Sequence, residues 1–127
     1  MIRSPYLTHG FMKLELQFRL PPGMALPAEA TDAHIVVTEG KQYADVLLGR
    51  SWHGTDGDRR VILASTTLSR KTSRRVVTLE LPGVPGQTWQ LNLPSDPDPT
   101  PGYSPWRLSG SPSAAKIEMN FRLSADR

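Results

Sequence analysis

The sequence predicts an all-β protein, an antiparallel β-sandwich of about seven strands that forms a single domain over residues 1–127. Apolar and polar side chains alternate with a period of two in several segments, which is typical of strands with one buried face. Twelve prolines and ten glycines interrupt the chain, and proline at this density opposes long helices. No segment combines helical periodicity with helix start and stop signals. A small β-barrel is the alternative architecture.

The first expected strand covers residues 13–20, where Leu14, Leu16, Phe18 and Leu20 fall on one face. Residues 21–23, with the sequence Pro-Pro-Gly, end it, and residues 24–32 are irregular with at most one helical turn. The remaining strands are expected at 34–39, 43–52, 60–68, 75–81, 88–93 and 117–123.

Turn residues separate these strands. Gly40-Lys41 predicts a turn, and Asp56-Gly57 predicts a tight hairpin because glycine readily takes the positive φ that such turns need. Residues 82–86 form a firm break with two prolines and two glycines. Residues 94–105 hold five prolines and form an extended loop, since proline cannot donate to a ladder.

The first and last expected strands share one pattern, offset by 103 residues. Parallel pairing would place like charges opposite one another, which is unfavourable. Antiparallel pairing of residues whose numbers sum to 137 opposes polar to polar and apolar to apolar. The pairs are Glu15 with Arg122, Gln17 with Asn120, Arg19 with Glu118, Leu14 with Leu123, Leu16 with Phe121, Phe18 with Met119 and Leu20 with Ile117. The competing interpretation is a homodimer, in which the first strand pairs with its own copy around Gln17 and Glu15 meets Arg19.

Signals of specific chemistry are missing. There is no cysteine, so disulfides and thiolate sites are excluded. No nucleotide-binding or hydrolase motif is present, and His9, His34 and His53 have no metal-ligand spacing. The acidic stretch 52–58 predicts a turn rather than a calcium loop, which needs more oxygen ligands. We therefore expect no catalytic residues, no metal and no cofactor.

No run of apolar residues is long enough for a membrane helix, and the first residues lack the apolar core of a signal peptide. We expect a cytoplasmic protein without membrane attachment, and the alternative is an exported protein in trimmed form.

Basic residues are unevenly distributed. Residues 59–79 contain six cations and no acid. If residues 60–68 and 75–81 form a hairpin, Arg70, Lys71 and Arg74 gather at its tip, where they can attract phosphate or nucleic acid.

Two functional hypotheses follow. The first is a non-enzymatic module that binds another protein, or a second copy of itself through an edge strand. Its interaction residues are Glu15, Gln17 and Arg19 on the first strand, and Tyr103 and Trp106 beside the proline-rich loop. The alternative is an anion-binding module that uses the basic hairpin.

Overall fold

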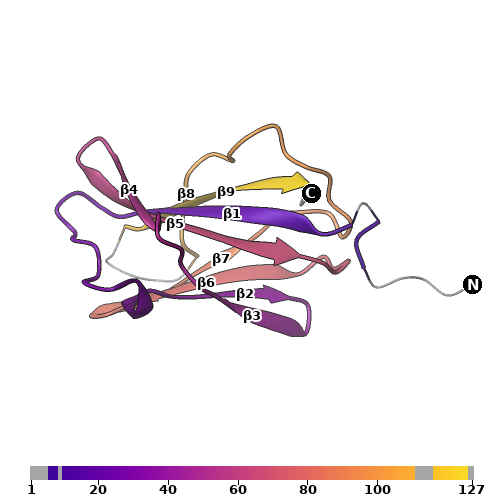
Figure 1. The fold of residues 1–127 in the computed structure, drawn as a ribbon, viewed down its shortest axis with the longest axis horizontal. Helices are drawn as coiled ribbons and strands as arrows, with labels where there is room; N and C mark the ends of the chain where they lie inside the picture. The colour runs from indigo at the N-terminus through magenta and orange to yellow at the C-terminus, as the bar shows by residue number, and fades with distance from the viewer. Residues whose placement is uncertain (1–5, 9, 111–115, 126–127) are drawn as a thin grey trace, which may run out of the picture.

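The computed structural model describes residues 6–8, 10–110 and 116–125, and it shows two antiparallel sheets packed face to face (Figure 1). The sheets remain separate and do not close into a barrel, so the predicted β-sandwich is confirmed. The five-stranded sheet has the order β4-β5-β1-β9-β8, and the four-stranded sheet has the order β3-β2-β6-β7.

The two sheets contain nine strands among the described residues. The first sheet contains β4 (His53–Asp56), β5 (Arg59–Leu68), β1 (Met12–Arg19), β9 (Glu118–Ala125) and β8 (Arg107–Leu108). The second contains β3 (Gln42–Val46), β2 (His34–Glu39), β6 (Arg75–Leu81) and β7 (Val84–Gln90). A single 3-10 turn, η1 (Ala30–Asp32), lies in the stretch that was expected to hold at most one helical turn.

The register between β1 and β9 confirms the predicted pairing. Every partnered pair from Met12↔Ala125 to Arg19↔Glu118 sums to 137. Leu20 and Ile117 lie one residue beyond this ladder, and both are fully buried. A shift by one residue would move the apolar face of β1 into solvent, which explains why the pattern specifies the register.

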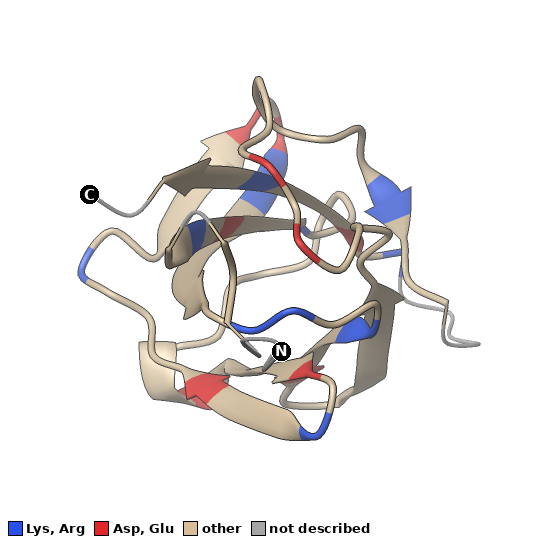
Figure 2. Ribbon diagram, turned by 90° about the vertical axis from the view of Figure 1, so that its right-hand side faces the viewer, with Lys and Arg blue, Asp and Glu red and all other residues tan. Residues whose placement is uncertain are grey.

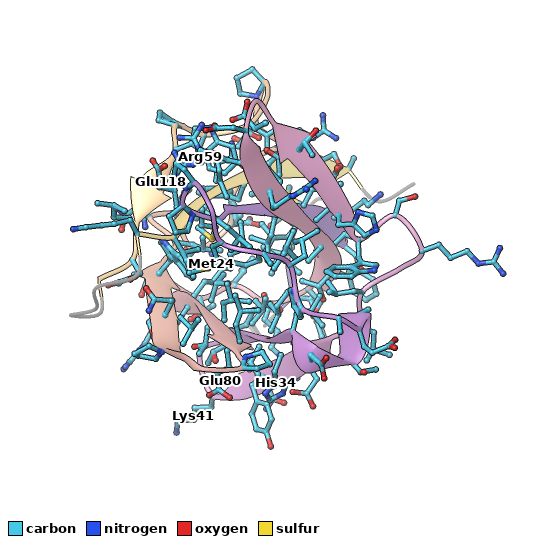
Figure 3. The ribbon with its side chains drawn as sticks, turned by 90° about the vertical axis from the view of Figure 1, so that its left-hand side faces the viewer. Met24, His34, Lys41, Arg59, Glu80 and Glu118 are labelled. Carbon is cyan, nitrogen blue, oxygen red and sulfur yellow. The ribbon has the colours of Figure 1, made fainter. Side chains whose placement is uncertain are left out.

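The apolar face of β1 lies in the core between the sheets. Leu14, Leu16 and Phe18 are almost completely buried, and the ring of Phe18 packs against Trp89 of β7 with centroids 5.4 Å apart. Residues 21–33 close one end of the sandwich, where Met24 packs against the core (Figure 3).

The predicted strand over residues 43–52 is too long. β3 ends at Val46, and the chain then crosses to the other sheet to form β4. The run Val46-Leu47-Leu48 does not alternate, and its middle residue points to solvent with 89% of its surface exposed. β4 itself and the two-residue β8 were not expected from the sequence.

The predicted break at residues 82–86 is also wrong in part. Only Pro82 and Gly83 form the turn, and β7 begins at Val84 and runs through Pro85. Proline is tolerated there because β7 is an edge strand, so its missing N–H is not needed by a second neighbour.

Two predicted turns are confirmed. Gly40-Lys41 joins β2 to β3, and the Asp-Gly signal marks the hairpin between β4 and β5. The loop residues of the latter are Gly57 and Asp58, with φ of +64° at Gly57. Glycine at the first loop position with positive φ is the pattern of a type II′ turn.

Candidate functional site

The outward face of the five-stranded sheet brings together all five residues that the sequence suggested for protein interaction. Glu15, Gln17 and Arg19 follow one another on the polar face of β1. Tyr103 and Trp106 reach this face from the segment that runs along β9. That segment is anchored by backbone hydrogen bonds from Thr100 N to Leu123 O, 3.0 Å, and from Ser104 N to Phe121 O, 2.8 Å.

Glu15 lies at the centre of the first cluster on this face. Its Oε2 accepts hydrogen bonds from Arg122 Nη2 at 2.7 Å and from the Tyr103 hydroxyl at 3.2 Å. The guanidinium of Arg122 stacks over the Tyr103 ring, 4.7 Å from its centroid. The bond from Arg122 lowers the pKa of Glu15, while burial and the nearby Glu15 carboxylate raise the pKa of Tyr103.

Arg19 lies at the centre of the second cluster. It binds Asp56 through Nη1 at 2.8 Å and Glu118 through Nη2 at 2.9 Å. Its guanidinium lies over the Trp106 ring, 4.4 Å from the centroid. Arg59 adds a second cation to Glu118 at 2.9 Å, and Figure 3 shows these two side chains together. The hydrogen bond to Asp56 raises the pKa of Arg19.

A groove of about 390 Å³ lies on this face beside the first cluster. We call it the β1 groove. It is lined by Lys13, Glu15, Leu16 and Gln17 of β1, Leu63, Ala64 and Ser65 of β5, Leu47, Gly49 and Ser51 of the β3–β4 connection, and Tyr103. Carboxylate, ammonium, amide and hydroxyl groups thus lie beside two exposed apolar side chains, Leu47 and Tyr103.

The expectation that β1 offers an edge for self-association is wrong. β1 pairs with β5 on one side and with β9 on the other, so neither of its backbone edges is free. The complementary charges of Glu15 and Arg19 are satisfied within the chain, by Arg122 and Glu118.

The aromatic residues near the proline-rich loop separate in space. Tyr103 and Trp106 lie on the outward face, each stacked under a guanidinium. Trp89 instead lies in the core and donates from Nε1 to Arg107 O at 3.0 Å.

The basic hairpin predicted between residues 60–68 and 75–81 does not form. β5 and β6 belong to different sheets, and Arg70, Lys71 and Arg74 lie on the connection between them. This connection passes the tip of the β2–β3 hairpin, since Gly40 N donates to Arg74 O at 2.8 Å. Lys41 therefore joins the three predicted cations at one end of the sandwich, where Figure 2 shows basic segments on both connections.

Within this basic end, Arg70 is the most constrained cation. Its guanidinium lies 5.4 Å from the centroid of the Tyr6 ring, and its backbone N donates to Glu39 Oε2 at 3.1 Å. Lys71 and Arg74 are exposed, and in the described part of the chain no ion pair involves them.

A neighbouring cation has a different role. Arg75 is completely buried, and its guanidinium donates to the carbonyl oxygens of Arg70, Pro94 and Ser95. Its Nε lies 3.8 Å from Glu39 Oε2. Burial lowers the pKa of Arg75, and Glu39 opposes this effect. Arg75 therefore fastens the start of the proline-rich loop to the β5–β6 connection and is not available to a ligand.

The outward face of the four-stranded sheet carries an exposed histidine between two carboxylates. His34 Nε2 lies 3.1 Å from Asp45 Oδ1, and its Nδ1 lies 3.6 Å from Glu80 Oε2. Figure 3 shows His34 beside Glu80. The hydrogen bond with Asp45 and the contact with Glu80 raise the pKa of His34. Among the described residues, no group of three or more His, Asp or Glu side chains has the arrangement of a metal site.

No protein-family model matches this chain, and searches among curated proteins and solved structures found no significant match. In the part of the chain that the structure describes, no helix is long and apolar enough to cross a membrane.

Proposed function

We propose that this chain is a non-enzymatic protein-interaction module that binds a short extended segment of another protein in the β1 groove. The observation that carries the proposal is the convergence of Glu15, Gln17 and Tyr103, with exposed Leu47, around one groove on a sheet face. Hydrogen-bonding groups for a peptide backbone lie there beside apolar surface for a side chain, which is the usual composition of a recognition site.

Contacts within the chain already order side chains that line the β1 groove in the unbound protein. Tyr103 is fixed by its bond to Glu15 and by the stacked Arg122. At the far end of β1, Arg19 and Trp106 fix the covering segment in the same way. A surface whose side chains are already ordered loses less entropy on binding, so its contacts yield more affinity.

The test selects, from a displayed peptide library, peptides that bind the immobilised whole chain. The affinity of a selected peptide is then measured for the parent and for variants of the chain. Gln17→Arg places a long side chain in the groove, and Leu47→Asp removes its apolar wall. The matched control is Gln90→Arg, an exposed position on β7 of the other sheet. We expect both groove variants to weaken a selected peptide at least about tenfold, or about 1.4 kcal/mol, and the control to bind as the parent does. Selected peptides that bind all variants equally would contradict the proposal.

A second candidate function is polyanion binding at the basic end. The observation that favours it is the bond between Gly40 and Arg74, because it adds Lys41 to Arg70, Lys71 and Arg74. Binding to phosphates by such exposed cations falls steeply with salt because counterions are released.

This candidate is tested by retention on a polyanion column. Reversal of Lys41, Lys71 and Arg74 to Glu should abolish retention at low salt. The charge-matched control reverses three exposed cations elsewhere, Arg50, Arg60 and Lys116. Equal loss of retention in both triple variants would show that net charge, and not the basic end, is responsible.

A further inference from the structure

The four strands at the sheet edges differ in how well their outer edges are protected. β7 is covered, since Gly110 N donates to Thr88 O at 2.9 Å and Arg107 Nη2 donates to Gln90 O at 2.6 Å. β8 has two residues and β4 has four. Short or covered edges are the usual protection against unwanted strand pairing.

β3 lacks such protection. It has five residues, and the first four of them, Gln42 to Asp45, are exposed. The side chain of Tyr43 is 74% exposed. β3 carries no proline and no bulge, and its ladder with β2 is regular from Glu39↔Gln42 to Ile35↔Val46.

The hairpin geometry shows which backbone groups of β3 are free. Gly40-Lys41 is a two-residue loop, so the closing pair Glu39↔Gln42 exchanges hydrogen bonds, and bonded pairs then alternate along the ladder. Gln42, Ala44 and Val46 therefore turn their N–H and C=O groups toward β2. Tyr43 and Asp45 turn theirs outward, and no hydrogen bond of the described residues uses these groups.

We propose that a second copy of this chain pairs with β3, antiparallel, about a two-fold axis at Ala44. In this register the numbers of opposed residues sum to 88, so Tyr43 faces Asp45 of the partner copy and Asp45 faces its Tyr43. Each of these pairs exchanges two backbone hydrogen bonds, and the two four-stranded sheets become one continuous sheet. The proposal does not rest on the β1 groove, which lies on the other sheet.

The side chains of β3 select this register over its neighbours. An axis at Asp45 would oppose two carboxylates, which is unfavourable. An axis at Tyr43 would place Asp45 opposite Lys41, which lies in the turn. The Tyr43 pair would then be the one hydrogen-bonded pair formed within β3. The axis at Ala44 avoids like charges and uses both outward residues, and it is therefore the register that we assign.

Disulfide trapping tests the register directly, because the chain contains no cysteine. Ala44 would face its own copy as a non-hydrogen-bonded pair with Cα atoms about 4.5 Å apart, which a disulfide can span. We expect Ala44→Cys to oxidise to a covalent dimer that forms much faster than with Thr55→Cys, an exposed control on β4. Equal rates for the two variants would overturn the proposal.

Sedimentation of variants at Tyr43 provides an independent test. Tyr43→Pro removes one outward N–H that β2 does not use, whereas Tyr43→Ala removes the ring and keeps that N–H. We expect the parent to be a dimer in concentrated solution and the proline variant to dimerise at least about tenfold more weakly than the alanine variant. A parent chain that remains monomeric up to about 1 mM would also overturn the proposal.

Discussion

Arg75 is the charged residue whose environment differs most from what its sequence context indicates. It belongs to a run of six cations without an acid, yet among the described residues it is the only charged side chain with no exposed surface. Three backbone carbonyls and the nearby Glu39 compensate for its burial. A buried charge is tolerated only when it is paired and hydrogen-bonded in this way.

We expect Arg75→Met to destabilise the protein strongly. The substitution leaves three carbonyls without their donor and leaves Glu39, whose side chain is 12% exposed, without its counter-charge. Loss of one partner from a buried pair costs about 3–5 kcal/mol. The measurement is the free energy of unfolding in urea, with Arg74→Met as the matched control at an exposed neighbour. A loss equal to that of the control, within about 0.5 kcal/mol, would contradict this role for Arg75.

His34 predicts a pH dependence of stability. Its pKa in the folded protein lies above the ordinary value of 6.5 because Asp45, and then Glu80, favour the charged ring. The stabilisation is therefore complete below about pH 6.5 and is lost as the pH rises through the folded pKa. We compare the unfolding free energies of the parent and His34→Gln between about pH 5.5 and about pH 8.5, a range that spans the loss of the His34 proton. We expect the difference between the two proteins to shrink as the pH rises. A difference that does not change with pH would argue against the two contacts.

Among the strands, β1 contributes to both the core and the candidate site because its two faces make different contacts. Leu14, Leu16 and Phe18 fill the core, while Glu15 and Arg19 hold the loop that carries Tyr103 and Trp106. Both tasks depend on the register with β9, since a shift by one residue would exchange the two faces.

Phe18→Ala should be among the most destabilising changes in β1. The ring is fully buried against Trp89, and its removal leaves a cavity between the sheets. Loss of a buried phenylalanine costs about 3–5 kcal/mol. Lys13→Ala, on the opposite face of the same strand, should cost less than about 0.5 kcal/mol. Chemical denaturation of both variants measures this contrast, and similar losses would show that β1 does not face the core as described.

The sequence predicts β1, β6 and β9 well because their residues alternate, and the complementary charges of β1 and β9 also predict their register. β2 is predicted by its β-branched residues. The sequence-based prediction is wrong where the chain leaves one sheet and crosses to the other. The run Val46-Leu47-Leu48 is apolar, yet it leaves the sheet. The basic connection was interpreted as a hairpin tip, because the sequence does not show that β5 and β6 lie in different sheets.

The candidate site shows the same division. Glu15, Gln17, Arg19, Tyr103 and Trp106 were named from the sequence and converge on one face. The sequence did not indicate three other residues of these surfaces, which are Leu47 and Ser51 in the groove wall and Lys41 at the basic end. These residues come from the connections between strands, and their positions depend on which elements pack beside them rather than on any local pattern.

For the whole molecule, the two sheets present separate surfaces. The five-stranded sheet carries the β1 groove on its outward face. The four-stranded sheet carries the unprotected edge of β3, and the two connections at one end carry the cations. β1 lies between β5 and β9 in the middle of the five-stranded sheet, so its outward face forms the floor of the β1 groove.

The most direct test of this account is the register between β1 and β9 in solution. Along an antiparallel ladder, non-hydrogen-bonded and hydrogen-bonded residue pairs alternate. The Hα protons of the two residues are close in the first kind of pair, and their amide protons are close in the second. Nuclear Overhauser effects between these two strands should therefore join residues whose numbers sum to 137, such as Gln17 with Asn120. The result that would contradict the account is a set of contacts with a different sum, or contacts from β1 to β1 of a second, differently labelled copy.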